Sequence, residues 1–159
     1  MPSQLAIYLR THEASALAAL DLARRTASSQ RRKPYADFLE QLVGEAEQDH
    51  SSLRMLMRHL GIRPDPVLQV TLRLGERAGR LKPNGHLVTR APLSDLLEVE
   101  FLLDMAYAKA TVWRGLEAAG VLDGNYPVDL SVLVKRADDQ VARLSEIHRS
   151  LTPGILEVS

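Results

Sequence analysis

A glutamate and a histidine three residues apart form the strongest chemical signal in this sequence. Glu47 and His50 lie in the stretch EAEQDH, which has the Glu-x-x-His pattern of dinuclear metal sites in helical bundles. On a helix, residues at positions i and i+3 lie on the same face, so a carboxylate and an imidazole reach the same level. Paired iron or manganese ions need such oxygen and nitrogen ligands. The motif therefore raises the hypothesis of a metal centre.

Two helices must position this motif. Apolar residues recur at helical spacing over about residues 3–28 and again over 34–60, and Gly61 can take the left-handed conformation that ends the second helix. Folding the two helices about the polar stretch near residue 31 places Glu13 opposite Asp49. Glu13, Glu47 and His50 are therefore expected at one level of the first hairpin.

The remaining chain predicts a second hairpin and a long connection. Residues 61–91 contain a shorter amphipathic helix that starts at Asp65-Pro66 and ends before Pro83, and further helices are expected over about 92–120 and 128–151. No segment shows the alternation of a strand. The predicted fold is all-α: one domain, residues 1–159, forming a ferritin-like four-helix bundle with an additional helix in the crossover.

The second hairpin offers few ligands for a complete dinuclear site. The matching level falls near Tyr107 and residues 137–140, where no Glu-x-x-His occurs. Glu98 and Glu100 lie about two helical turns from this level, and Asp104 and Asp138 are closer but have short side chains. Glu146 and His148 are two residues apart, so their side chains point in different directions. No catalytic, cofactor-binding or metal-binding residue is therefore assigned.

A purely structural interpretation of the polar residues is favoured. His12 and His50 are then histidines at the edge of the core, tied to neighbouring carboxylates. Glu47 is a solvated charge near Arg54 or Arg58, and Trp113 packs at one end of the bundle. Nucleophile elbows and phosphate-binding glycine loops are absent from the sequence.

The amino-acid composition and the charge distribution exclude several classes of protein and partner. The chain has no cysteine, and no apolar run is long enough to cross a membrane. Without a recognisable targeting segment, a cytoplasmic location is expected. The formal net charge is 0, with basic and acidic segments alternating, so nucleic acid is not an expected partner. Packing between basic and acidic faces favours a homodimer.

The crossover helix is basic and amphipathic. Its arginines and lysine (Arg73, Arg77, Arg80 and Lys82) repeat opposite an apolar set (Val67, Val70, Leu74 and Leu81). One hypothesis is binding to an anionic partner or a membrane surface. The favoured alternative is that the apolar side packs on the bundle and the arginines meet acidic segments.

The stretches LRTHEASALAAL, EAEQDHSSLRMLMRHLG and PLSDLLEVEFL, in this hairpin–crossover–hairpin order, resemble an actinobacterial branch of the ferritin-like superfamily that is similar to the YciF-like bundles. The resemblance implies iron or manganese, oxidase or storage chemistry, and dimerisation. It places Glu13, Glu47 and His50 on ligand positions, with Glu100 as a fourth. The leading hypothesis is a binding or assembly protein with a degenerate metal site. The alternatives are a dinuclear iron or manganese protein and an anion-binding or membrane-binding protein.

Overall fold

The computed structural model describes residues 3–78, 91–121 and 127–156. These residues form helices α1 (Gln4–Ser29), α2 (Ala36–His59), α3 (Pro66–Ala78), α4 (Pro92–Ala118) and α5 (Leu130–Leu151), followed by a 3-10 turn at Thr152–Gly154. No strand occurs within these ranges. The predicted all-α class is confirmed. The prediction for residues 79–90 of the crossover, including Arg80, Leu81 and Lys82, lies outside the described residues.

The helix ends follow local backbone chemistry. The Ser3 hydroxyl accepts a hydrogen bond from the Ala6 amide and caps α1, and Pro92 begins α4 at a position where no amide hydrogen is needed. Gly61 and Gly120 end α2 and α4 with φ of 68° and 58°, a left-handed conformation that favours glycine. The predicted role of Gly61 is confirmed.

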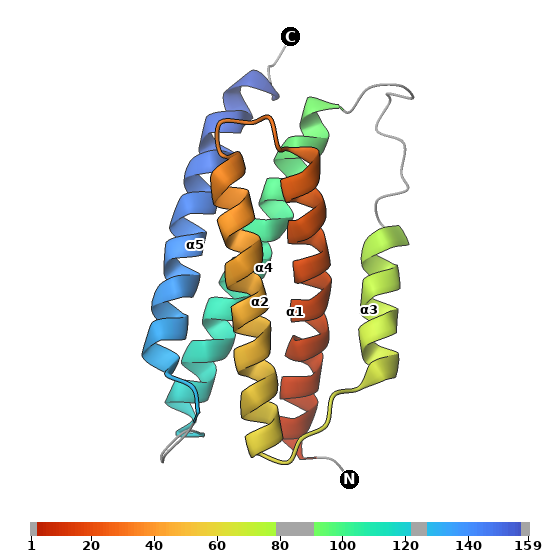
Figure 1. The fold of residues 1–159 in the computed structure, drawn as a ribbon, viewed down its shortest axis with the longest axis vertical. Coiled ribbons are helices and arrows are strands. Elements are labelled where there is room, and N and C mark those ends of the chain that lie inside the picture. The colour runs from red at the N-terminus through yellow and green to blue at the C-terminus, as the bar shows by residue number, and fades with distance from the viewer. Residues whose placement is uncertain (1–2, 79–90, 122–126, 157–159) are drawn as a thin grey trace.

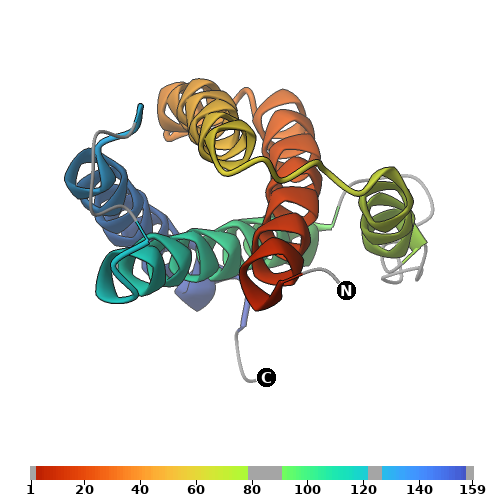
Figure 2. The same ribbon diagram turned by 90° about the horizontal axis from the view of Figure 1, so that it is seen from below.

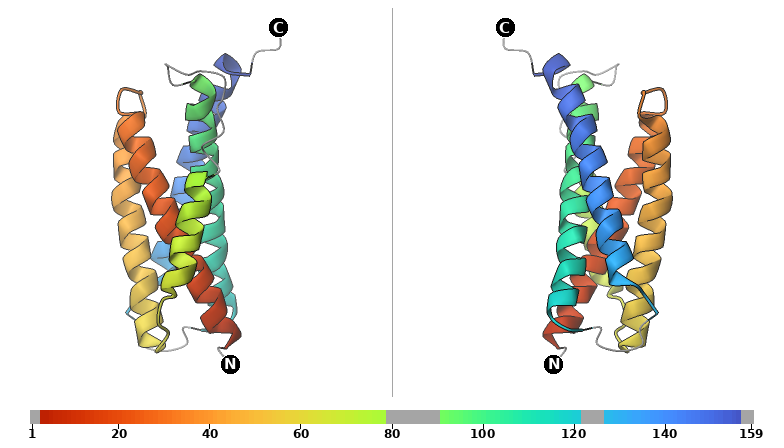
Figure 3. Two further views of the ribbon diagram at one scale, coloured as in Figure 1. Left: turned by 90° about the vertical axis from the view of Figure 1, so that its right-hand side faces the viewer. Right: turned by 90° about the vertical axis from the view of Figure 1, so that its left-hand side faces the viewer.

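The four long helices run nearly alongside one another (Figure 1), with α1 and α2 antiparallel and α4 and α5 antiparallel. Viewed end-on, α1 lies between α2 and α4, and α5 lies beyond α4 (Figure 2). The side views show the same two pairs (Figure 3). Helices α2 and α5 are neighbours on the remaining side of the bundle (Figure 2), where long side chains bridge them. Among the described helices, none has the length and apolar character that crossing a bilayer requires.

Helix α3 lies outside the four long helices, against α1 (Figure 1). Among the α3 side chains that the structure describes, those of Leu68, Gln69 and Leu72 are half-buried. Val67, Val70 and Leu74, which were expected to pack on the bundle, are exposed. That expectation is wrong, because the opposite side of α3 carries its own pair of leucines and a glutamine that binds a buried carboxylate of α1.

The interior consists of two apolar clusters. One contains Leu9, Leu56, Trp113 and Leu133, and the other contains Leu22, Leu39, Leu102 and Leu144. Both draw residues from α1, α2, α4 and α5. Between the two clusters, these four helices carry polar side chains, several of them buried. We call this set the polar layer; it comprises Glu13, Glu45, Asp49, His50, Lys109, Arg136 and Gln140.

Candidate functional site: a polar layer and its cavity

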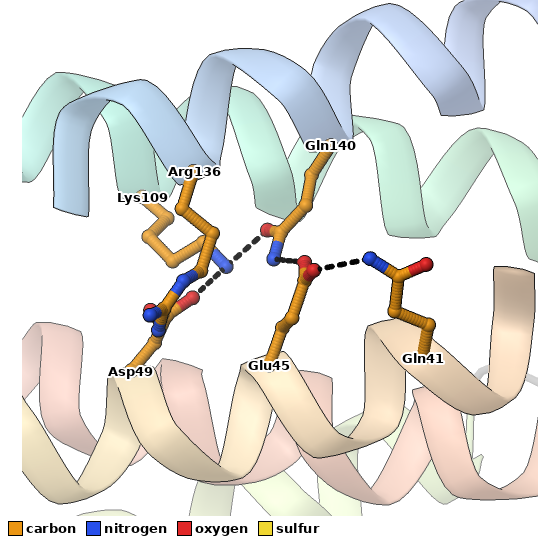
Figure 4. A network of polar contacts seen from close by, with 6 residues as sticks. All are labelled: Gln41, Glu45, Asp49, Lys109, Arg136 and Gln140. Atoms are coloured by element: carbon orange, nitrogen blue, oxygen red, sulfur yellow. Dashed lines mark hydrogen bonds and ion pairs between the residues drawn. The ribbon is translucent and has the colours of Figure 1, made fainter. Parts of the chain in front are cut away.

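Asp49 on α2 is the centre of the polar layer on the α2–α5 side (Figure 4). Its carboxylate Oδ2 accepts from Lys109 Nζ at 2.5 Å, and its Oδ1 accepts from Arg136 Nη1 at 2.9 Å. The Asp49 side chain is 4% exposed. Two cations from α4 and α5 therefore neutralise one buried carboxylate from α2, which compensates the cost of removing that charge from water.

Gln140 on α5 extends this network. Its side-chain oxygen accepts from Lys109 Nζ, and its Nε2 donates to Glu45 Oε2 at 2.6 Å. Glu45 Oε1 in turn accepts from Gln41 Nε2 at 2.7 Å (Figure 4). Because Gln140 is 1% exposed, its amide needs partners on both sides, and the network supplies them. These contacts join α2, α4 and α5 where the backbones of α2 and α5 are too far apart to pack directly.

Glu13 on α1 forms the other half of the layer. It is fully buried, and its two oxygens are bonded to His50 Nε2 at 3.0 Å and to Gln69 Nε2 at 2.7 Å. Burial by itself raises the pKa of Glu13. The hydrogen bonds of Glu13 with His50 and Gln69, and the electrostatic effects of His50 and Arg54, outweigh burial and hold the pKa of Glu13 below its ordinary value. Glu13 is therefore an anion held between α2 and α3.

The structure brings together only part of the predicted ligand set. Glu13 and His50 meet at one level, as expected. Glu47 does not join them, because it is half exposed and binds Arg24 Nη2 at 2.7 Å. The expectation that Glu47 joins Glu13 and His50 is wrong, because the rotation of α2 about its axis turns Glu47 toward the surface, where Arg24 of α1 reaches it. Its solvated character is as expected, but its partner is Arg24.

The carboxylates of the second hairpin lie away from the layer. Glu100 is half exposed and lies 3.4 Å from His148 Nε2 on α5. Asp138 binds Arg114 at the surface, at 2.6 Å. Glu98 accepts from Gln30 Nε2 at 2.9 Å, near the end of α1. The position of Glu100 as a fourth ligand is therefore wrong.

The donor set does not fit a dinuclear metal centre. No group of three or more histidines, aspartates or glutamates within metal-binding reach occurs among the described residues. All four oxygens of the two innermost carboxylates, Glu13 and Asp49, are already bonded to protein nitrogen. Lys109, whose ammonium lies between Asp49 and Gln140, provides a fixed positive charge in this layer.

A cavity of about 80 Å³ adjoins the layer at the centre of the bundle. Its walls are largely apolar and rich in alanine: Ala16, Ala19 and Ala23 of α1, Ala46 of α2, and Ala106 and Ala108 of α4. Polar side chains gather among its lining residues, including His12, Asp49, His50, Lys109 and Gln140. Two of these alanines, Ala23 and Ala106, are buried, and larger residues at their positions would fill part of the space.

Two cavity residues have unusual polar environments. Trp113 is 2% exposed, and its indole Nε1 has no hydrogen-bond partner among the described residues. Such a buried donor carries a desolvation cost that a bound acceptor would offset. Burial lowers the pKa of His12, so this imidazole favours the neutral form. The predicted packing of Trp113 is confirmed in part, since it lies in the apolar cluster toward the end of α4.

A second hollow, about 460 Å³, lies between α2 and α5. Its lining includes Glu45, Arg136 and Gln140, so the polar layer forms part of its surface. Arg143 borders it and lies over the ring of Phe38, 4.5 Å from the ring centre. This hollow has both acidic and basic walls, whereas the central cavity is mainly apolar.

Sequence reasoning located the level of the site but missed its chemistry. The level was placed near Tyr107 and residues 137–140, and Lys109, Arg136 and Gln140 lie there. A search for metal ligands passes over lysine, arginine and glutamine. The available signal was the presence of Lys109 beside Ala106 and Ala110, both buried, on a largely apolar helix.

Comparison of this chain with family models, curated proteins and solved structures finds no match.

Proposed function

We propose that this chain is a ferritin-like binding protein whose central cavity takes a small, mainly apolar group that carries a hydrogen-bond acceptor. The observation that carries the proposal is the cavity itself: it has alanine walls, adjoins the charged layer and is lined by Trp113, whose buried Nε1 has no partner among the described residues. Mainly apolar pockets with a few convergent polar groups are the usual form of small-molecule sites.

The polar layer supports binding rather than metal chemistry. In a dinuclear carboxylate protein the inner carboxylates neutralise two cations, whereas here Lys109, Arg136 and His50 take their oxygens. A fixed network of this kind holds the cavity wall in one geometry. It also provides donors and acceptors that orient the polar end of a ligand.

The size of the cavity limits the ligand. A cavity of about 150 Å³ accepts benzene, so about 80 Å³ suits roughly three heavy atoms, such as one end of a slightly larger molecule. The Trp113 donor selects a carbonyl or hydroxyl oxygen over a purely apolar group. The ligand class is therefore a short or branched carbon chain bearing such an oxygen.

Two probes of similar shape test this function. We expect 2-butanone to raise the melting temperature and change the fluorescence of Trp113, the single tryptophan. We expect 2-chlorobutane, which lacks a good acceptor, to bind about ten-fold more weakly, because an unsatisfied buried donor costs about 1–3 kcal/mol.

Matched alanine variants complete the test. Ala106→Leu places a larger side chain in the cavity lining and should abolish both signals, whereas Ala142→Leu on the exposed side of α5 should preserve them. Equal responses of the two variants would contradict cavity binding. So would the absence of any response to 2-butanone up to its solubility limit.

A further inference from the structure

Helix α3 presents an apolar stripe to solvent. Val67 is 75% exposed, Val70 56% and Leu74 57%, and their spacing places them along one side of the helix. The opposite side holds α3 in place, through Gln69 to Glu13 and through the half-buried Leu68 and Leu72. The stripe is therefore not needed to attach α3 to the bundle, and large apolar side chains gathered on an exposed surface mark interaction sites.

Positive charge accompanies the stripe. Residues 63–90 contain six basic and two acidic residues, a formal charge of +4, within a chain whose net charge is 0. At the start of α3, Arg10 Nε donates to the Arg63 carbonyl oxygen at 2.8 Å. Neither arginine forms an ion pair with a carboxylate of the described part of the chain.

The exposed area of the stripe distinguishes between two possible partners, a second copy of the chain and a lipid surface. Its three side chains expose on the order of 300 Å² together, whereas each partner in a stable protein–protein interface buries about 800 Å². A second copy of the chain would therefore need contacts well beyond the stripe. A lipid surface needs no complementary shape: it takes up apolar side chains at the headgroup boundary and attracts nearby basic residues.

We infer that α3 docks this protein on an anionic lipid surface. Val67, Val70 and Leu74 enter the boundary between headgroups and acyl chains, and Arg63, which is exposed just before the helix, contacts the anionic headgroups. Asp65 caps the helix by accepting from the Val67 and Leu68 amides at 3.0 and 3.1 Å, so the stripe is already helical before docking. A helix formed in advance avoids the entropic cost of folding on the surface.

Vesicle co-sedimentation of the full chain tests the inference. We expect binding to phosphatidylcholine vesicles that contain about a third phosphatidylglycerol, little binding to pure phosphatidylcholine, and weaker binding at high salt. The double substitution Val70→Asp with Leu74→Asp should weaken binding at least about ten-fold, since it replaces inserted apolar groups with anions. Arg63→Gln should weaken binding to anionic vesicles only.

The control is Phe101→Asp, the same kind of change at a half-exposed apolar residue of α4. It should leave binding unchanged, and circular dichroism should show all variants folded. The inference would be overturned if the chain did not bind anionic vesicles at low salt, or if Phe101→Asp weakened vesicle binding as much as the double substitution. It would also be overturned if the chain bound no vesicles and formed a dimer that Leu74→Asp dissociates. The last result would identify a second copy as the occupant.

Discussion

Asp49 shows how one residue organises the centre of this molecule. A carboxylate that is nearly excluded from solvent is stable as an anion only if cations accompany it. Lys109 and Arg136 come from different helices of the second hairpin, so the single charge on α2 fixes both. The same arrangement takes up the oxygens that a metal would require.

Removing this charge should be costly. We expect Asp49→Ala to reduce the free energy of unfolding by about 3 kcal/mol or more, because it leaves two cations facing each other in a poorly solvated layer. Lys109→Met should cost less, about 1–3 kcal/mol, since Arg136 still neutralises Asp49. Urea unfolding measures both.

The matched control is Lys135→Met, which breaks the exposed pair of Lys135 and Asp139 on α5. Its effect should be too small to measure, because exposed ion pairs contribute little. If Asp49→Ala proved as mild as this control, the central role of Asp49 would be refuted.

At the scale of elements, the described side chains that attach α3 are Gln69, which donates to the buried Glu13, and the half-buried Leu68 and Leu72. Amphipathic periodicity predicted the helix and its start at Asp65-Pro66. The same periodicity could not say which side faces α1, since both sides carry apolar residues. Gln69 determines which side of α3 packs on α1, because it donates to Glu13, 56 residues away in the sequence.

Loss of the Gln69 contact should loosen α3 without unfolding the bundle. We expect Gln69→Leu to accelerate amide hydrogen exchange throughout α3 by about ten-fold, because local opening then no longer breaks a hydrogen bond to a buried carboxylate. Amides in α5 should keep their protection.

Thr71→Val provides the comparison for this prediction. Thr71 is exposed on α3, and its hydroxyl donates to the Val67 carbonyl oxygen, one turn earlier in the same helix. An exchange rate in the Gln69→Leu variant no faster than in Thr71→Val would show that Gln69 does not anchor the helix.

For the whole molecule, the buried Glu13 and the half-buried His12 set the direction of the pH dependence. The pKa of His12 lies below its ordinary value of 6.5, and that of Glu13 lies below 4.5. In both cases the unfolded chain binds the proton more readily than the folded chain. Folding stability therefore decreases on acidification, first as pH falls below 6.5 through His12 and then below 4.5 through Glu13.

This pH dependence can be assigned by substitution. We expect Glu13→Gln to flatten the part of the stability profile below about pH 4.5, and His12→Asn to flatten the part just below about pH 6.5. Urea unfolding at several pH values measures both profiles. A steeper acid loss in Glu13→Gln than in the unchanged chain would contradict a lowered pKa for Glu13 in the folded protein.

The homodimer, the cytoplasmic location and the ferritin-like relationship stay predictions. By itself, the sequence determined the helices, because apolar periodicity, prolines, capping side chains and glycines act within a few residues of one another. It also determined the level at which Glu13 meets His50, since a short loop fixes how the first hairpin pairs.

Only the tertiary structure decided what the polar residues do. Packing between the two hairpins sets the rotation of each helix. That rotation determines whether Glu47 faces inward or meets Arg24, and whether Lys109 occupies the centre of the layer. The outward direction of the α3 stripe was decided in the same way, through Gln69 and Glu13. Such contacts join residues far apart in the chain, and local periodicity carries no information about the choice among several amphipathic faces.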